Sequence, residues 1–143
     1  MLDFGAHIPF VELLGFELHQ FADGRSEVQY PTLPEHLNSF HIVHGGASMA
    51  LMDVAMAAAA RSVQPDMGVV TVEMKTSFMR PAKGRLTAKG HLLHRSGEMA
   101  FVEASIFDPQ GRLCTHGTGT FKYVRRTKVI SAGGAPTDAI ATD

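Results

Sequence analysis

The sequence predicts an α+β fold in which a curved antiparallel sheet wraps around one long central helix. Three features predict it: a long apolar segment suited to a single helix, four strand-like segments that follow it, and two shorter ones that precede it. A helix that is apolar on every side needs an apolar surface to cover it, and a curved antiparallel sheet supplies one. The 143 residues are enough for one domain with a substantial core.

The predicted helix runs from Gly45 to Arg61. It starts directly after His44 with two glycines, and a turn with Pro65 follows its end. Its body is almost wholly apolar, so we expect it to be buried, and the single carboxylate within it is Asp53. A buried carboxylate is costly unless it is paired, protonated or used. Free N–H groups at the helix start and a carboxylate in its middle are two parts that a site acting on a carbonyl group needs.

After this helix, the hydrophobic period changes to two, which predicts strands. The expected strands span residues 68–80, 85–95, 99–107 and 113–124. In the first of them, one face is predicted to carry Val70, Val72, Met74, Thr76 and Phe78. The segments 81–84, 96–97 and 108–111 contain turn-forming glycines and prolines. Long strands joined by tight turns predict an antiparallel meander.

The region before the helix predicts a short amphipathic helix at residues 7–14 and a hairpin. The hairpin pairs residues 16–21 with 26–30 across Asp23-Gly24, a strong turn signal. We assign residues 1–126 to a single domain. Residues 127–143 are small, polar and aperiodic, and are expected to form a flexible C-terminal tail.

Composition and charge exclude several classes of function. The formal net charge is −1, and no basic stripe is interleaved with aromatic residues, so we expect no nucleic-acid partner. The single cysteine, Cys114, excludes an internal disulfide and fits a reducing compartment. No apolar run reaches the roughly 20 residues that span a bilayer, and the N-terminus lacks a signal-peptide pattern. We therefore expect a cytoplasmic protein without a membrane partner.

The eight histidines do not form a metal-binding pattern. His36, His41 and His44 lack the i, i+4 spacing of a helical ligand pair, and no thiolate or set of acids lies nearby in the sequence. We expect neither a metal nor a separate cofactor.

The order of two strands, a loop, a glycine-led helix with an acid and four strands resembles the hotdog fold. The local motifs resemble those of the phenylacetate-pathway (PaaI-type) acyl-coenzyme A thioesterases, over roughly residues 7–124. The matching segments are His36-Leu37-Asn38, His44-Gly45-Gly46, Leu51-Met52-Asp53 and Met79-Arg80-Pro81-Ala82. The resemblance implies hydrolysis of an acyl-coenzyme A thioester, with coenzyme A as part of the substrate.

The resemblance also implies a role for each catalytic residue. Asn38 would hold the thioester or the attacking water, and the N–H of Gly45 would polarise the carbonyl. Asp53 would be the general base or the nucleophile, and the hydroxyl of Thr71 would assist the water, although serine is frequent in relatives at that position. His44 would fix the loop and touch the carbonyl.

Physical chemistry supports this division of roles. A thioester carbonyl gains negative charge when a nucleophile adds, and unpaired N–H groups at a helix start stabilise that charge. Glycine lets the substrate approach the backbone because it has no Cβ. Coenzyme A carries phosphates, so further substrate contacts are expected from Gly46 at the helix start and from the basic residues Arg80, Lys83 and Arg95.

The spacing of Gly45 and Asp53 has a consequence for assembly. The two residues are eight positions apart on one helix, which corresponds to ~12 Å. One carbonyl group cannot lie within ~3 Å of both. If both act on one thioester, they come from different chains, and we expect a homo-oligomer with sites at subunit interfaces. Strand edges offer the route to a dimer, and the resemblance implies a dimer of dimers.

Two alternatives remain open at this point. A hydratase or dehydratase on the same fold would use His41 or His44 together with Asp53. A non-catalytic acyl-coenzyme A binding module would keep the pocket without turnover. The acyl group, aromatic or medium-chain, is likewise open.

Overall fold

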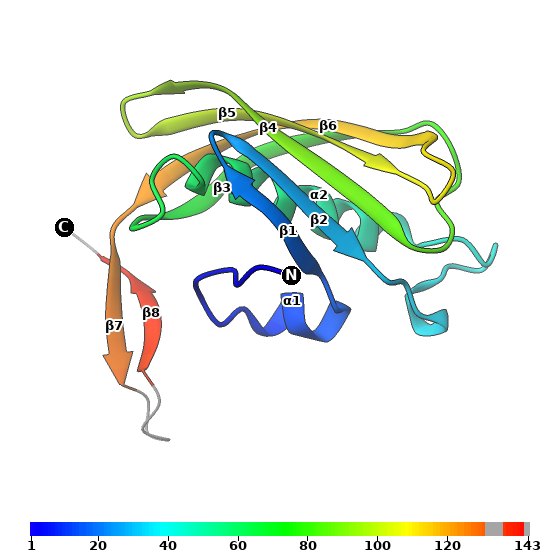
Figure 1. The fold of residues 1–143 in the computed structure, drawn as a ribbon, viewed down its shortest axis with the longest axis horizontal. Helices are drawn as coiled ribbons and strands as arrows, with labels where there is room; N and C mark the ends of the chain where they lie inside the picture. The colour runs from blue at the N-terminus through cyan, green and yellow to red at the C-terminus, as the bar shows by residue number, and fades with distance from the viewer. Residues whose placement is uncertain (131–135, 142–143) are drawn as a thin grey trace.

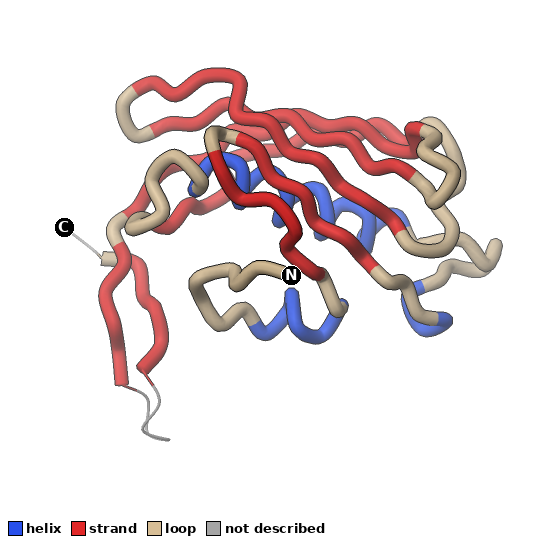
Figure 2. Tube along the Cα trace, viewed as in Figure 1, coloured by secondary structure: helices blue, strands red, loops and turns tan. Residues whose placement is uncertain are grey.

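The computed structural model describes residues 1–130 and 136–141. Its main feature is a six-stranded antiparallel sheet with the strand order β1-β2-β4-β5-β6-β3. The strands are β1 (Glu17–Ala22), β2 (Arg25–Tyr30), β3 (Gly68–Phe78), β4 (Leu86–Ser96), β5 (Met99–Phe107) and β6 (Leu113–Val124). The helices are α1 (Pro9–Leu14), a 3-10 turn at Pro34–His36, and α2 (Gly45–Arg61). The sheet arches over α2 (Figures 1 and 2), as the sequence predicted.

Helix α2 lies against the concave face of the sheet and forms the centre of the core. Leu51, Met52, Ala55 and Met56 are fully buried there. The approach is close on the β4 side, because a Cβ at Gly90 would overlap the carbonyl oxygen of Ala55. The same oxygen accepts a hydrogen bond of 2.6 Å from the hydroxyl of Ser26 on β2. Glycine at position 90 is therefore a condition for this packing.

The helix is not buried on every side, which corrects the expectation from its composition. Its face opposite the sheet carries Met49, which is 38% exposed, and the half-buried Ala50, Asp53, Val54 and Ala57. These positions follow helical spacing and form one continuous stripe, named here the open face of α2. An apolar stripe with one carboxylate is the surface that a single chain leaves uncovered.

Strand β3 contains a β-bulge at Val72. Thr71 pairs with Phe121 and Glu73 pairs with Thr120, so Val72 has no partner on β6 and is 55% exposed. The predicted face is therefore wrong for Val70 and Val72. The extra residue shifts the alternation, so that Thr71 before the bulge and Met74 after it both turn toward α2.

The two outer edges of the sheet differ. Leu2 forms an antiparallel bridge to Leu18 and donates its N–H to the Leu18 carbonyl over 2.7 Å, so the N-terminus partly covers the β1 edge. Strand β3 forms the other edge and has β6 as its only neighbour in the sheet order. The predicted meander of four consecutive strands is therefore wrong for β3, because β4 pairs with β2 and the chain crosses from one edge region of the sheet to the other after β3.

The C-terminal segment differs from the expected tail. Strands β7 (Arg126–Ile130) and β8 (Pro136–Ile140) form a separate two-stranded antiparallel sheet, which extends away from the end of β6 (Figure 1). The sequence analysis did not predict these two strands, and the rest of the predicted tail, residues 131–135 and 142–143, lies outside the described residues. The tail was predicted from its overall small and polar composition, and the preference of Thr127, Val129 and Ile130 for strands was not considered. Within the described residues, no helix has the length and apolar character needed to cross a bilayer.

Candidate active site

Asp53 and Thr71 are brought together across the helix and the edge strand. The Thr71 hydroxyl donates to Asp53 Oδ1 over 2.6 Å. Asp53 accepts this bond on the open face of α2, where it is half-buried. The hydroxyl therefore fixes one carboxylate oxygen and leaves the second available for a proton or for attack.

Gly45 begins α2, and its N–H has no acceptor among the described residues. The first N–H groups of a helix have no partner within the helix. The ring of Phe78 packs over this glycine, because a Cβ at position 45 would lie 3.6 Å from two of its ring carbons. Gly45 thus presents a free donor beneath an aromatic wall, at the positive end of the helix dipole.

A pocket of about 330 Å³ opens beside Gly45. Asn38, Phe78, Met79 and Arg80 are among the residues that form its wall. Its lining also includes Ser48 and Thr115, which are almost fully buried. The sequence interpretation missed both residues, although Ser48 lies three positions after Gly45 and so shares its helix face.

Asn38 shapes the loop that leads to this pocket. Its Oδ1 accepts hydrogen bonds from the backbone N–H groups of Phe40 (2.9 Å) and Ile42 (3.4 Å). Its own N–H donates to the Ile42 carbonyl over 2.8 Å. The side-chain NH2 group has no acceptor among the described residues, so Asn38 can still donate to a ligand in the pocket.

His44 caps the helix. Its Nδ1 accepts from the N–H of Gly46 over 2.9 Å, so the neutral ring carries its hydrogen on Nε2. This fixes the helix start, as expected for His44, but it occupies the Gly46 donor. Gly46 and His44 line a different pocket, beside His36 and Phe10. The structure therefore does not bring Gly46 to the Gly45 pocket.

The three basic residues expected to contact substrate separate in the structure. Arg80 lines the Gly45 pocket, and Lys83 is exposed in the following turn. Arg95 stacks on the ring of Tyr123 at 4.1 Å and donates to Gln64 over 3.0 Å. It lies by the β4–β5 turn, at the opposite end of the sheet from the β3–β4 turn (Figure 1). Within one chain, Arg95 is not part of this pocket.

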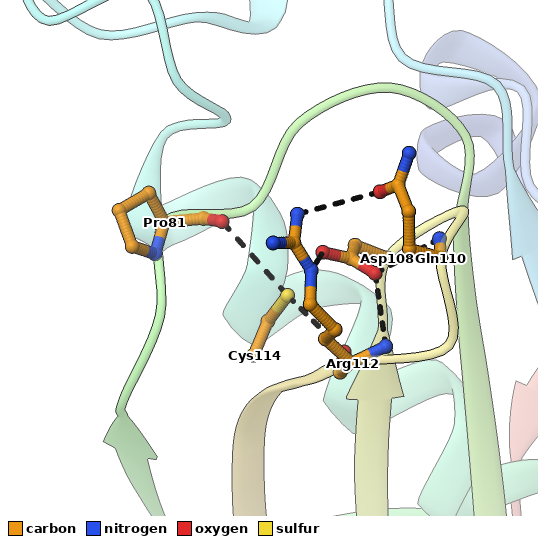
Figure 3. A network of polar contacts seen from close by, with 5 residues as sticks. All are labelled: Pro81, Asp108, Gln110, Arg112 and Cys114. Carbon is orange, nitrogen blue, oxygen red and sulfur yellow. Dashed lines mark hydrogen bonds and ion pairs between the residues drawn. The ribbon is translucent and has the colours of Figure 1, made fainter.

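A network of polar contacts around the buried Asp108 lies next to the chain segment that contains Pro81 (Figure 3). Asp108 accepts from the N–H groups of Gln110 (3.0 Å) and Arg112 (2.9 Å) and from Arg112 Nε (2.7 Å). Burial alone would raise the pKa of Asp108, but its hydrogen bonds with Arg112 outweigh burial and lower it. The adjacent Cys114 accepts the backbone N–H groups of Met79 and Arg80 at its carbonyl oxygen, so this turn positions the strand end that carries Arg80.

Asp53 does not reach the Gly45 pocket. It lines a second pocket of about 350 Å³, which Gly45 does not reach. This separation agrees with the distance expected from their spacing. In the described residues, no three His, Cys, Asp or Glu side chains gather in a way that could hold a metal ion.

Comparison with known proteins places the chain in a family. The family model of the thioesterase superfamily matches residues 40–115. "Putative esterase SSO2140" of Saccharolobus solfataricus is 34% identical over 107 residues, covering 74% of this chain and 76% of that protein.

Solved structures agree. The conserved protein PA5202 of Pseudomonas aeruginosa has a TM-score of 0.79 and 31% identity, covering 84% of this chain and 97% of that one. The PaaI protein of the Escherichia coli phenylacetic acid degradation operon has a TM-score of 0.75 at 22% identity. The match covers 80% of this chain and 83% of that one, and it shows the shared fold. The architecture is thus that of a hotdog-fold thioester hydrolase. The chain belongs to the thioesterase superfamily.

Proposed function

We propose that the protein is an acyl-coenzyme A thioesterase in which Asp53 of one chain and Gly45 of a second chain act on the same thioester. The observation that carries this proposal is the division of the catalytic parts between two pockets. The oriented carboxylate lies in one pocket and the free helix-start donor in the other.

The carboxylate side supplies the attack. Asp53, with Oδ1 held by Thr71, either removes a proton from water or attacks the carbonyl carbon itself. In the first route, the water oxygen adds to the carbonyl carbon and the carbon–sulfur bond breaks. The proton passes through Asp53 to the sulfur, and the products are the free acid and free coenzyme A.

The helix-start side stabilises the charge that develops. The N–H of Gly45 donates to the carbonyl oxygen, and such a donor is worth about 3 kcal/mol of barrier. Asn38 lines the same pocket, and its NH2 group can hold the substrate or the water. Arg80 lines the pocket and Lys83 is exposed nearby in the sequence, and in this proposal their positive charges attract the phosphates of coenzyme A.

The surface of the chain supports a dimer formed through β3. This strand is a sheet edge, with Val72 exposed on it, and the open face of α2 lies beside it. Pairing two β3 edges would cover both apolar surfaces and bring the Asp53 of each chain toward the pocket of the other. We propose a dimer of dimers, located in the cytoplasm and acting on aromatic or medium-chain acyl groups without a metal.

The first experiment measures thiol release from a panel of acyl-coenzyme A thioesters, with chelator present. The wild type should release thiol, and Asp53→Asn should lose on the order of 10² in turnover. Full activity in Asp53→Asn would reject its assignment. Loss of an enoyl thioester without thiol release would indicate a hydratase, and binding without any turnover would indicate a binding module.

A mixing experiment tests the two-chain site. Chains with Asp53→Asn and chains with Gly45→Val should each be inactive as homo-oligomers. After denaturation and joint refolding, a mixed dimer contains one site with both residues intact, so about a quarter of wild-type activity should return. No recovery, with mixed dimers demonstrated by mass spectrometry, would contradict a site shared between chains.

A further inference from the structure

The pocket that contains Asp53 continues along α2 toward its C-terminal end. Val54, Ala57, Ala58 and Arg61 all line it, and their spacing of i, i+3, i+4 and i+7 places them on one helix face. The N-terminal segment and β3 supply its other walls, among them Phe4, Ile8 and Val69. Asp53 and Arg61 are eight residues apart, or ~12 Å along the axis. The pocket is thus a groove with a carboxylate at one end, an apolar middle and a guanidinium at the other.

Arg61 is unusual because it is charged and only 9% exposed. Its three hydrogen bonds go to neutral backbone carbonyls, of Met67 (3.2 Å), Phe4 (2.9 Å) and Pro65 (3.5 Å). A guanidinium has five N–H donors, so two remain for another acceptor. A buried cation whose hydrogen bonds all go to neutral carbonyls is a ready partner for an anion.

The other charges at this end do not neutralise Arg61. Arg126 and Asp138 also line the groove, but they form an ion pair with each other at 3.6 Å. Burial lowers the pKa of Arg61, Arg126 lowers it further and Asp138 opposes the effect, yet an arginine stays protonated at physiological pH. The far end of the groove therefore carries one surplus positive charge.

Building on the proposed thioesterase activity, we propose that this groove holds the acyl chain and that Arg61 binds an anionic group at its far end. The preferred substrates are medium-chain acyl thioesters with a carboxylate at the end remote from the thioester. An unsubstituted fatty acyl chain of the same length fills the apolar middle but leaves the surplus charge without a partner. A chain with a terminal carboxylate satisfies both ends of the groove.

The wild-type enzyme provides the first test. Thiol release is measured for suberoyl- against octanoyl-coenzyme A, and for adipoyl- against hexanoyl-coenzyme A. We expect kcat/KM to favour a carboxylate-bearing member by about tenfold or more, the effect of a hydrogen bond to a charged group. Equal rates, or a preference for the plain chains, overturn the assignment of Arg61 and leave the thioesterase proposal intact. No thiol release from any acyl-coenzyme A overturns both.

Variants then assign the preference to Arg61. In Arg61→Gln, the ratio of suberoyl to octanoyl kcat/KM should fall toward one while octanoyl hydrolysis is kept. Arg61→Lys should retain part of the preference. Arg85→Gln is the matched control, because Arg85 is also held by polar partners but lies outside the groove, and it should leave the ratio unchanged.

Equal losses for both substrates in Arg61→Gln would show that Arg61 only anchors the N-terminal segment. Thermal unfolding of each variant separates this result from loss of the fold. If Arg61→Gln does not fold, the wild-type ratio alone decides.

Discussion

Thr71 and Asp53 are joined by a hydrogen bond of 2.6 Å, although one lies on the edge strand and the other on the central helix. The bond depends on the bulge at Val72. Before the bulge, Thr71 pairs with the buried Phe121 and faces the helix, whereas Glu73 pairs with Thr120 and accepts a hydrogen bond from it over 2.7 Å on the outer face.

Removing the Thr71 hydroxyl should impair turnover more than binding. Thr71→Val is expected to lower kcat roughly tenfold or more, a fraction of the full acid–base contribution, with little change in KM, because the carboxylate loses its orientation. Thr71→Ser should restore most of the activity. A pH–rate profile should shift for the valine variant and not for the serine variant. Unchanged kcat in a folded Thr71→Val enzyme would contradict this role.

Substitution by alanine should lower stability at one glycine and activity at another. Gly90→Ala should lower the free energy of unfolding by about 1–3 kcal/mol, because the new Cβ would overlap the Ala55 carbonyl and lie 2.5 Å from Ser26 Oγ. Gly45→Ala should keep its stability, since its Cβ meets Phe78 at an ordinary 3.6 Å, but lose activity because the methyl group crowds the donor. Denaturant unfolding and thiol release measure the two effects. A stable Gly90→Ala protein would mean that the helix can move away from the sheet.

The two buried tyrosines form a matched pair for stability. Tyr30 is fully buried, its hydroxyl has no partner within the described residues, and burial raises the pKa of Tyr30 to about 12. Tyr30→Phe should therefore be neutral or stabilising. The Tyr123 hydroxyl donates to the Ala60 carbonyl over 2.6 Å, so Tyr123→Phe should cost about 1 kcal/mol. Denaturant unfolding compares them, and a larger loss in Tyr30→Phe would reveal a partner for that hydroxyl.

Asp108 should make stability depend on acidic pH. Its pKa is lowered in the folded state relative to about 3.9 in the unfolded chain. The stabilisation is therefore present above the unfolded value and is lost as the pH falls through the folded-state pKa. Asp108→Asn should have a lower free energy of unfolding than the wild type at neutral pH. The difference between the two proteins should become smaller in strongly acidic buffer, as measured by denaturant unfolding. If the difference in free energy of unfolding between the two proteins does not change with pH, the charge of Asp108 does not stabilise this turn.

The helix and the consecutive pairing of β4, β5 and β6 could be predicted because several local signals agreed. The predicted span of α2 is the observed one, Gly45–Arg61, since two glycines and a following proline bracket an apolar run. Asn38 and Gly45 were predicted for the same site and line the same pocket. Thr71 was predicted as a site residue through resemblance, and the structure brings its hydroxyl to Asp53 Oδ1.

Other features could not be predicted from the sequence because they depend on tertiary contacts. The bulge at Val72 is hidden in a run of alternating apolar residues, and only pairing with β6 reveals the extra residue. The hydrogen bond that occupies the Gly46 donor comes from the rotamer of His44. The position of Arg95 follows from the β4–β5 turn, and the buried surroundings of Arg61 arise from the N-terminal segment that closes over it.

The contrast between the two sheet edges limits how copies of this chain can grow into larger assemblies. With Leu2 bridged to Leu18, the β1 edge is a poor template for a further strand, so stacking β1 of one molecule on β3 of the next is disfavoured. Such head-to-tail stacking would propagate without end as a fibre. The remaining contact joins β3 of one chain to β3 of a second chain, and this contact is complete after two copies. The bridge from Leu2 to Leu18 thus protects the β1 edge from pairing with a strand of another molecule.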